Sequence, residues 1–301
     1  MDGILNVLKP PGMTSSDVVV FLRKNLGIKK IGHTGTLDPE AAGVLPVCLG
    51  KATRISDYIM HRDKIYRCGM KLGITTDTAD LTGHVISESD NIPDMGKIEK
   101  AFEAFHGQQD QIPPMHSAIK VEGKKLYELA RQGIQLELEP RKIQIHKIKL
   151  IAHYPNNVIL FETVCSKGTY IRALCRDIGN YLGCGAAMAF LIRTASGNFN
   201  LKDSMTLDEI LQAHEQGELD SLVIPMDRAL ENVMPCIVLK EECRDRVSHG
   251  NQIEEDYILE KAESAVTGRL CRIYCGSKFM GVGYYTAGNG RKAIKMKSVL
   301  V

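Results

Sequence analysis

The sequence lacks the features that would mark a membrane-spanning, secreted or strongly charged protein. No apolar run approaches about 18 residues, the length that suggests a membrane span, and no charged-then-apolar leader opens the chain. We therefore expect a cytoplasmic protein without a membrane partner. The 38 Lys and Arg residues nearly balance the 36 Asp and Glu residues, so the bulk charge gives no sign of a nucleic-acid partner. Internal repeats and low-complexity tracts are also missing.

The chain also lacks a cysteine framework. Its nine cysteines are scattered and form no Cys-x-x-Cys pair. Cys271 and Cys275 are close in sequence, but no matching His or Cys pair follows them, which argues against a zinc site. An odd number of cysteines without regular spacing is typical of reduced thiols in a cytosolic protein. We expect neither disulfides nor a metal site.

What the chain does have is an unusual loop at residues 32–43, which reads Gly-His-Thr-Gly-Thr-Leu-Asp-Pro-Glu-Ala-Ala-Gly. Glycine and proline at this density fix an irregular backbone path rather than a helix or a strand. Asp38 stands at the turn, and Pro39 moves it away from the α region of backbone space. A rigid loop that presents a single carboxylate is suited to display a nucleophile or a general base.

Several local readings compete for this loop. The phosphorylation loop of ion-pumping ATPases would need an Asp where the chain has Gly32. A phosphate-binding loop ending at Lys51 would be two residues too long, with Ala52 where Ser or Thr should ligate magnesium. A glycosidase would need a second carboxylate, for which Glu40 is available. The local chemistry also fits a structural turn with a capping Asp, so it does not decide the function.

Patterns along the rest of the chain predict a mixture of strands and helices. Thr14, Ser15 and Ser16 can cap a helix that runs from Asp17 and is stopped by Gly27. Tyr66 falls on the apolar face of a strand that alternates over residues 65–72. A strong apolar stripe predicts a helix at 171–182, with Arg172 just inside its N-terminus and off the stripe. The other expected elements are strands at 4–7, 143–151 and 158–165, helices at 53–60, 98–105 and 126–131, and a β-rich unit at 236–301 with a hairpin turn at 289–290.

Further blocks of sequence accompany the loop. They are Lys-Pro-Pro-Gly-Met-Thr-Ser at 9–15, Lys-Ile-Tyr-Arg at 64–67, Gln-Ile-Pro-Pro-Met-His-Ser-Ala at 111–118, Gly-Lys-Lys-Leu-Tyr with Ala-Arg-Gln-Gly within 123–133, and Cys-Ser-Lys-Gly-Thr-Tyr-Ile-Arg at 165–172. Together with the loop, these blocks closely resemble the TruB family of tRNA pseudouridine synthases. They stand in family order and cover most of the chain, which makes the combined match highly specific.

The resemblance implies an α/β (α+β) fold with two domains. Residues 1–233 would form the pseudouridine synthase domain, a mixed and largely antiparallel sheet with flanking helices. Within it, residues 111–138 resemble an exposed arm that wraps tRNA. Residues 234–301 resemble a PUA domain, a small RNA-binding β-barrel, although the motifs there are weaker.

The implied activity is the isomerisation of uridine to pseudouridine at position 55 in the T-loop of tRNA. This reaction breaks the N1–C1′ bond, rotates the base and joins C5 to C1′, so it needs no metal, organic cofactor or energy donor. It needs a nucleophile that can form and release a covalent adduct, which a carboxylate can do. The target base must be flipped out of the folded loop to be reached. The expected partner is the T-stem-loop of tRNA, and we expect a monomer.

The resemblance also implies roles for individual residues. Asp38 would be the nucleophile, with Arg172 beside it to fix the direction of the carboxylate. Tyr66 would stack on the target base and help remove the C5 proton. Tyr170 would line the uridine pocket, and His33 would fill the gap that the flipped base leaves.

Other positions carry weaker implications. Thr194 stands where the family usually has an aliphatic residue that encloses the uracil, so the pocket wall would be more polar there. The block at 9–15 is expected to be scaffold near the catalytic loop. Four cations of the arm are candidates for binding RNA, although a cluster of this kind can also be a solvated face: Lys120, Lys124, Lys125 and Arg131.

Two rival functions stay open at this point. One is a guide-RNA-dependent synthase of the same family, which usually carries basic extensions; this chain reaches its first motif within its first ten residues and keeps the arm, so we expect no guide RNA. The other is an RNA-folding or RNA-binding protein that has lost catalysis. The presence of Asp38, Tyr66 and Arg172 together speaks against it.

Overall fold

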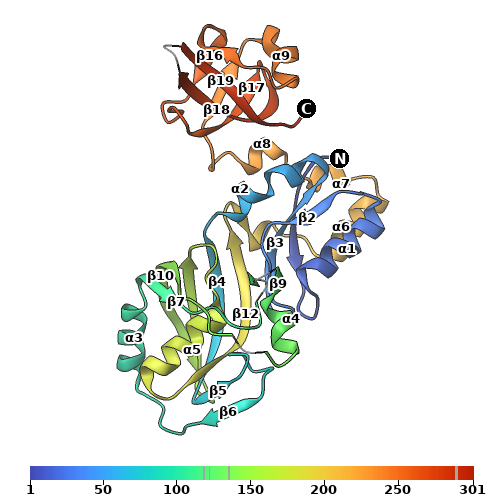
Figure 1. The fold of residues 1–301 in the computed structure, drawn as a ribbon. Helices are drawn as coiled ribbons and strands as arrows, with labels where there is room; N and C mark the ends of the chain where they lie inside the picture. The colour runs from blue at the N-terminus through green and yellow to red at the C-terminus, as the bar shows by residue number, and fades with distance from the viewer. Residues whose placement is uncertain (118, 122, 135, 289–290) are drawn as a thin grey trace.

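The computed structural model describes residues 1–117, 119–121, 123–134, 136–288 and 291–301 of the chain. Its strands form a large sheet in the N-terminal part of the chain and a smaller sheet in the C-terminal part (Figure 1). Helices flank the large sheet, and the smaller sheet lies beyond α8 at one end of the molecule. No helix in these described ranges is long and apolar enough to cross a membrane.

The large sheet has the strand order β1-β3-β12-β4-β11-β10-β7, with β2 paired to β3 and β13 paired to β12. Neighbouring strands are antiparallel except β12 and β3, which run parallel. This arrangement confirms the mixed, largely antiparallel sheet predicted from the sequence. The strands are β1 (Gly3–Lys9), β2 (Ile31–His33), β3 (Ala42–Leu49), β4 (Lys64–Leu72), β7 (Gly107–Gln111), β10 (Arg141–Tyr154), β11 (Val158–Cys165), β12 (Ala186–Ser196) and β13 (Phe199–Asn200).

Two helices cover one face of the central strands, α3 (Met95–Ala104) and α5 (Ile171–Leu182). Alternate residues of β4 point toward them, because successive side chains of a strand face opposite ways. Met70 and Cys68 of β4 are fully buried in a cluster with Leu174 and Ile178 of α5 and Phe102 of α3. The apolar stripe predicted for residues 171–182 therefore seats α5 on the sheet, and this fixes where its first turn begins.

Two further helices pack beside the β1–β3 end of the sheet, α1 (Ser15–Leu26) and α6 (Leu207–Glu215). Of the three predicted caps, Thr14 is the one that helix α1 uses, and the helix begins at Ser15, two residues before the predicted start. Thr14 and Asp17 form a capping box, in which each side chain accepts a hydrogen bond from the other residue's backbone N–H. It ends at Gly27, which adopts a left-handed conformation with φ 67°. The helix predicted at 53–60 is divided into a 3-10 segment, η1 (Gly50–Ile55), and a short helix, α2 (Ser56–Met60).

The arm leaves the sheet after β7 and returns at β10. It contains a short hairpin and a helix: β8 (Lys120–Val121), β9 (Lys124–Lys125) and α4 (Leu126–Arg131). The helix coincides with the one predicted at 126–131. A second hairpin, β5 (Ile74–Thr76) with β6 (Val85–Glu88), extends from the end of β4. Its connecting turn carries residues that reach the candidate site.

The C-terminal strands form a curled, half-barrel sheet in the order β15-β19-β18-β17-β14-β16 (Figure 1). It is the small β-rich unit expected from the sequence, and the turn predicted at 289–290 lies outside the described residues. Short helical segments link the two sheets or lie around the second: η2 (Leu201–Asp203), α7 (Leu219–Leu222), α8 (Met226–Ala229), η3 (Glu241–Cys243), α9 (Arg244–Ser248) and η4 (Glu255–Tyr257). The strands are β14 (Cys236–Leu239), β15 (Ile253–Glu254), β16 (Ile258–Lys261), β17 (Leu270–Cys275), β18 (Lys278–Gly288) and β19 (Arg291–Val299).

Apolar and polar contacts join the second sheet to the rest of the chain. Val282 of β18 is buried in one cluster with Ile59 of α2. Arg272 of β17 donates a hydrogen bond to the carbonyl of Asp227, and the Tyr274 hydroxyl donates to the carboxylate of the same Asp227. The second sheet is therefore docked on α2 and α8. The domain boundary that we place between residues 233 and 234 stays a prediction.

Candidate active site

Asp38 lies on the loop between β2 and β3, residues 34–41, which we call the Asp38 loop. The loop is pinned at both ends. The Thr34 amide donates to the Pro46 carbonyl at 3.0 Å, and the Ala41 amide donates to the Asp38 carbonyl at 3.1 Å. Gly35 has a φ of 137°, a left-handed value that strongly favours glycine. The loop thus has the irregular, rigid path that its Gly and Pro content predicts.

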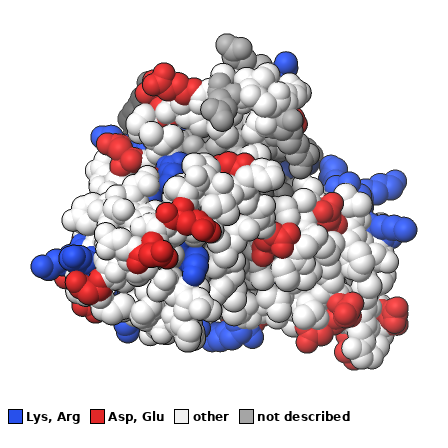
Figure 2. All heavy atoms as spheres, turned by 90° about the horizontal axis from the view of Figure 1, so that it is seen from below, with Lys and Arg blue, Asp and Glu red and all other residues white. Residues whose placement is uncertain are grey.

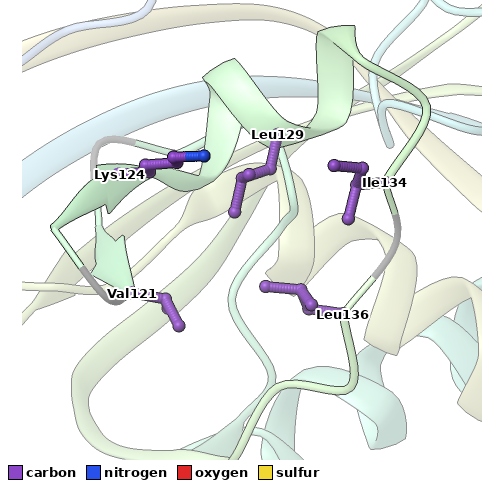
Figure 3. Close-up of a pocket in the computed structure, with 5 residues that line it drawn as sticks. All are labelled: Val121, Lys124, Leu129, Ile134 and Leu136. Carbon is purple, nitrogen blue, oxygen red and sulfur yellow. The ribbon is translucent and has the colours of Figure 1, made fainter.

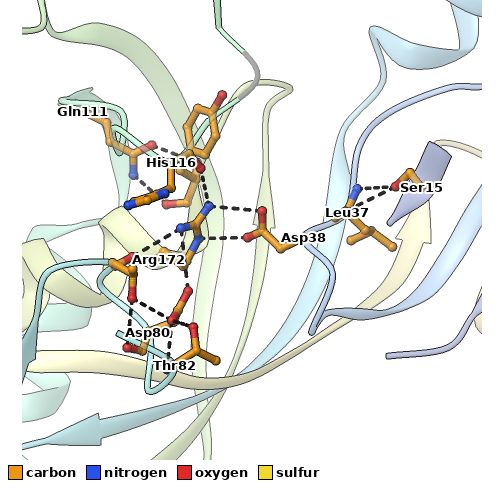
Figure 4. A network of polar contacts seen from close by, with 10 residues as sticks. Ser15, Leu37, Asp38, Asp80, Thr82, Gln111, His116 and Arg172 are labelled. Atoms are coloured by element: carbon orange, nitrogen blue, oxygen red, sulfur yellow. Dashed lines mark hydrogen bonds and ion pairs between the residues drawn. The ribbon is translucent and has the colours of Figure 1, made fainter. Parts of the chain in front are cut away.

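Residues 9–15 hold the Asp38 loop in place through hydrogen bonds. The Ser15 hydroxyl accepts a hydrogen bond from the Leu37 amide at 2.9 Å and donates one to the Leu37 carbonyl at 3.3 Å (Figure 4). The fully buried Lys9 ammonium donates to the carbonyls of Pro10 at 2.7 Å, Pro39 at 3.0 Å and Met13. Burial lowers the pKa of Lys9 to about 8. These contacts clamp the residues on either side of Asp38.

Arg172 holds the Asp38 carboxylate in a two-point contact. Its Nε donates to Asp38 Oδ2 at 2.9 Å, and its second terminal nitrogen donates to Asp38 Oδ1 at 3.1 Å (Figure 4). Such a fork fixes both the position and the rotation of a carboxylate. The Arg172 side chain is 5% exposed, whereas that of Asp38 is 36% exposed. The carboxylate is therefore oriented from the inside and still accessible from the outside.

The other donors of Arg172 reach two segments that lie far away in the sequence. They bond to the carbonyl of His116 at 2.8 Å, in the arm, and to the carbonyl of Thr78 at 3.3 Å, in the β5–β6 turn. A second carboxylate, Asp80, lies 3.7 Å from Arg172 through Oδ2. Its Oδ1 accepts from the Thr82 amide at 3.0 Å and from the Thr82 and Thr78 hydroxyls. Arg172 therefore links the Asp38 loop, the arm and the β5–β6 turn.

Sequence reasoning did not identify Asp80. The available signal was the density of Thr, Asp and Gly at residues 75–83, which marks a turn whose side chains bond to their own backbone. A turn of this kind holds a carboxylate in a fixed direction. Nothing in the pattern indicates that the carboxylate faces Arg172, because the two residues are 92 positions apart and no local pattern connects them.

Tyr66 lies in the middle of the sheet, on β4. It is 8% exposed and belongs to the same buried cluster as Leu37, the residue before Asp38. In the strand register it stands opposite Arg193 of β12 on one side and Thr163 of β11 on the other. Burial raises the pKa of the Tyr66 phenol, and the positive charge of Arg193 partly opposes that rise. Tyr66 thus lies on the buried face of β4, as its place in the alternating pattern predicts, and it packs in the same cluster as the Asp38 loop.

The remaining pocket candidates lie around this centre. Tyr170 is the N-cap of α5, and its amide and carbonyl are both bonded to the side chain of Gln111, at 2.9 and 3.0 Å. Burial raises the pKa of Tyr170. His33 ends β2 at the entrance to the Asp38 loop, and burial lowers its pKa. The Thr194 hydroxyl donates to the Ile65 carbonyl at 3.3 Å, so its polar group is already bonded within the sheet.

The arm carries a cavity of about 280 Å³, lined by Val121, Lys124, Leu129, Ile134 and Leu136 (Figure 3). A second cavity, of about 210 Å³, lies between the arm and the β5–β6 turn, with Thr78 and Arg176 in its wall. Asp38 is not among the described residues that line either one. Of the four predicted RNA-binding cations, only Lys124 can be placed, and it lines the first cavity. The other three fall outside the described side chains: Lys120, Lys125 and Arg131.

Charged side chains of both signs lie on the face of the molecule that Figure 2 shows. On the face drawn in Figure 2, acidic and basic groups alternate over much of the area, with basic groups gathered toward both flanks. Within the described ranges, no group of three or more His, Cys, Asp and Glu side chains is arranged to hold a metal ion. What the site offers chemically is an oriented carboxylate, a buried phenol and several cations bonded to backbone carbonyls.

Comparison with known proteins assigns this arrangement to a family. Residues 23–171 match the model of the TruB family pseudouridylate synthase N-terminal domain, and residues 172–231 match the model of the tRNA pseudouridylate synthase B C-terminal domain. A protein of Alkaliphilus oremlandii (strain OhILAs) named tRNA pseudouridine synthase B is 45% identical over 301 residues, covering 100% of this chain and 99% of that protein. One of the same name from Clostridioides difficile (strain 630) is 41% identical over 304 residues, covering 100% of both.

Two solved structures are similar over almost the whole chain. A chain in the structure of an H/ACA RNP bound to a substrate RNA containing 2′-deoxyuridine is 27% identical, with a TM-score of 0.77. A chain in the crystal structure of a Cbf5-Nop10-Gar1 complex is 28% identical, with a TM-score of 0.78. Each match covers 99% of this chain and 85% of the other.

Proposed function

The chain belongs to the TruB family of tRNA pseudouridine synthases, and on that premise we propose that it converts the uridine at position 55 in the T-loop of tRNA, with Asp38 as the nucleophile. The family predicted from the sequence motifs is confirmed, and with it an isomerase that makes pseudouridine in tRNA. The choice of position 55 and the roles of individual residues are our proposal. The observation that carries it is the half-exposed Asp38 carboxylate held by the Arg172 fork at 2.9 and 3.1 Å.

The geometry supports a specific role in the reaction for each of these side chains. Uridine and pseudouridine have the same atoms, so the N1–C1′ bond breaks, the C5–C1′ bond forms, C5 loses a proton and N1 gains one. Asp38 is oriented before the substrate arrives, which removes the entropic cost of positioning a nucleophile. Its remaining lone pairs face outward, because the Arg172 fork occupies the inner side. Tyr66, buried beside the same loop, is the group proposed to take the C5 proton.

The bound nucleoside would lie in a site built from several segments. Tyr170 and Thr194 are proposed to line the uracil pocket, and His33 is proposed to occupy the space left in the RNA when the base flips out. His33 suits an apolar stacking role, since burial lowers its pKa and favours the neutral imidazole. The arm and the C-terminal unit at 234–301 are proposed to hold the T-stem-loop through Lys and Arg contacts to phosphates.

We further propose that the enzyme acts as a monomer in the cytoplasm and without a guide RNA. The solved relatives come from an H/ACA RNP bound to a substrate RNA and from a Cbf5-Nop10-Gar1 complex. The curated relatives, at 41–47% identity, are named for tRNA instead. Because the sequence is closer to the second group, bare tRNA is the substrate we expect.

The test is direct. Purified protein is incubated with a T-loop RNA hairpin and no other RNA, and pseudouridine is mapped by chemical modification. We expect conversion at position 55 alone. Asp38→Asn should abolish conversion, and Arg172→Ala should lose it while still binding the RNA. Full conversion by Asp38→Asn would refute its role, and conversion only after a guide RNA is added would refute the stand-alone mode.

A further inference from the structure

A second buried arginine, Arg193 on β12, has no role in the function as described so far. Its side chain is 1% exposed and is among the largest fully buried side chains of the molecule. Within the described residues, no carboxylate lies within ion-pair distance of it. A buried charge without a counter-ion is costly unless dipoles satisfy it. The hydrogen-bond partners of this guanidinium therefore indicate its function.

The guanidinium is satisfied by backbone carbonyls on both sides of Asp38. It donates to the carbonyls of Gly35 at 3.1 Å and Thr36 at 3.4 Å, where the chain enters the Asp38 loop. It also donates to the carbonyl of Val44 at 2.7 Å, where the chain leaves the loop. One rigid side chain thus ties both stems of the loop to the central sheet.

Gly43 makes this close approach possible. It is the strand partner of Arg193 where β12 and β3 run parallel. A Cβ at residue 43 would lie 2.2 Å from the Arg193 carbonyl oxygen, and Gly43 has a φ of 114°. Only a glycine allows the two backbones to meet this closely. The position of Arg193 relative to the loop is therefore built into the backbone as well as into its hydrogen bonds.

Tyr66 stands on the other side of Arg193. The two residues are register partners in the antiparallel β4–β12 pair, where opposing side chains lie on the same face of the sheet. Both are buried. A guanidinium near a phenol favours the phenolate, and the charge of Arg193 lowers the pKa of Tyr66 against the larger effect of burial. Arg193 therefore contacts the loop of the nucleophile and acts on the phenol at the same time.

We propose that Arg193 is a positioning residue for pseudouridine formation, which holds the Asp38 loop at both stems and sets the Tyr66 phenol against it. This inference rests on the proposed roles of Asp38 and Tyr66. The sequence pattern does not single out Arg193, because this residue precedes Thr194 in an apolar strand and looks like any other arginine in a strand. Only the register and the three carbonyls identify it.

The experiment compares Arg193→Lys and Arg193→Met with a matched control, Arg67→Met. Arg67 is next to Tyr66 on β4 but points to the opposite face, where it pairs with Glu162 at 3.1 Å and is 55% exposed. Single-turnover rates are measured on a saturating T-loop hairpin, together with hairpin affinity and the cooperativity of thermal unfolding. We expect Arg193→Met to be slower by about 100-fold, as for a nucleophile misplaced by about 1 Å. Arg193→Lys, which keeps the charge and loses the fork, should be slower by roughly tenfold.

Two further readouts separate positioning from general stability. Hairpin affinity should stay within about threefold of wild type in both Arg193 variants, since the change acts on the reacting groups rather than on RNA contacts. With deuterium at C5 of the target uridine, Arg193→Met should show a larger isotope effect than wild type, because a displaced Tyr66 slows the loss of that hydrogen. Arg67→Met should match wild type in rate, affinity and isotope effect.

Each contrary outcome has a defined meaning. A folded Arg193→Lys enzyme with the wild-type rate overturns the proposal, whether or not Arg193→Met folds. Failure of both variants to fold also overturns it, because Arg193 would then serve stability alone. A slower rate with an unchanged isotope effect overturns it as well, because the loss of Arg193 would then leave the action of the Tyr66 phenol unchanged. If Asp38→Asn is inactive and Arg193→Met is not impaired, only the inference about Arg193 fails. If Asp38→Asn is fully active, the site assignment itself fails, and this inference fails with it.

Discussion

The replacement Arg172→Lys tests the central geometric feature of the site, the fork on Asp38. Arginine presents five donors in a fixed plane, and four polar contacts of Arg172 with Asp38, His116 and Thr78 use that plane. Lysine has three donors at a single point and cannot bond to both carboxylate oxygens and to both carbonyls. The variant keeps the charge of the buried side chain but releases the rotation of the carboxylate.

The size of the effect follows from the contacts that are lost. A hydrogen bond to a charged group contributes about 1.5–3 kcal/mol, so losing one arm of the fork corresponds to roughly 10- to 150-fold in rate. The Asp38 side chain is 36% exposed, and solvent screens the pair. We therefore expect the single-turnover rate to fall by about 30-fold, with hairpin affinity nearly unchanged, since no contact to the RNA is removed.

The assay follows release of the C5 hydrogen from a labelled T-loop hairpin at saturating enzyme. Arg176→Lys is the matched control, since Arg176 lies one turn further along α5 and donates to the carbonyl of Ile112 at 3.0 Å and to Asp177 at 2.8 Å. It should stay within about twofold of wild type, because its two bonds, to Ile112 and Asp177, lie away from the Asp38 carboxylate. If Arg172→Lys behaves like Arg176→Lys, the fork does not orient the nucleophile and our account of the site is wrong.

Three further predictions test the surroundings of Asp38. Asp80→Asn removes a charge 3.7 Å from Arg172 but keeps an oxygen that accepts from the Thr82 amide. The rate of pseudouridine formation should therefore fall by roughly tenfold while the protein stays folded. An unchanged rate would exclude an electrostatic role for Asp80. Gly43→Ala places a Cβ 2.2 Å from the Arg193 carbonyl oxygen and should lower the unfolding free energy by about 3 kcal/mol or more. The control Gly12→Ala places its Cβ where no atom lies within 4 Å, so it should cost only about 1–2 kcal/mol of backbone strain. Equal losses of unfolding free energy in urea would contradict this prediction. Lys9→Met should change the pH dependence of stability. Burial lowers the pKa of Lys9 from 10.5 to about 8, so the unfolded chain binds more protons between those values and wild-type stability should gain a contribution from Lys9 as pH rises from 8 to 10.5. Lys64, lowered to about 8 mainly by burial, adds a similar contribution, so urea unfolding of Lys9→Met should show a smaller rise than wild type and not a flat profile.

Local patterns in the sequence predicted the elements that carry the site. The Thr14 capping box and Gly27 delimit α1, and the apolar stripe of residues 171–182 places Arg172 in the first turn of α5. These signals are short-range, because a cap or a stripe is decided within one or two helical turns. The stripe did not show that Arg172 would be buried. Its position off the stripe suggested exposure, whereas Asp38, His116 and Thr78 close around it.

The contacts between elements could not be predicted in this way. Arg193 reaches the site through the parallel β12–β3 pairing and bonds to Val44, 149 positions away. Asp80 reaches it from the β5–β6 turn and lies 92 positions from Arg172. No local pattern specifies such a register. The family resemblance supplied Asp38, Tyr66 and Arg172 because those residues stand inside its motifs. The resemblance gave no information on which backbone carbonyls would accept hydrogen bonds from a buried cation.

The charges around Asp38 explain why this carboxylate suits a reaction that must also release it. Lys9 and Arg193 are both fully buried, and both are bonded to backbone carbonyls rather than to carboxylates. Among the described residues, Arg172 is the cation that bonds directly to Asp38. Asp38 therefore lies in the electrostatic field of three cations, and it partly neutralises the charge of one of them, Arg172. Such a field makes a carboxylate a weaker nucleophile and a better leaving group, because it favours the charged form over the covalent adduct. In its proposed role Asp38 is a nucleophile that has to leave C1′ or the base within every turnover, so the second property matters as much as the first. Removing any of the three cations should slow release more than attack.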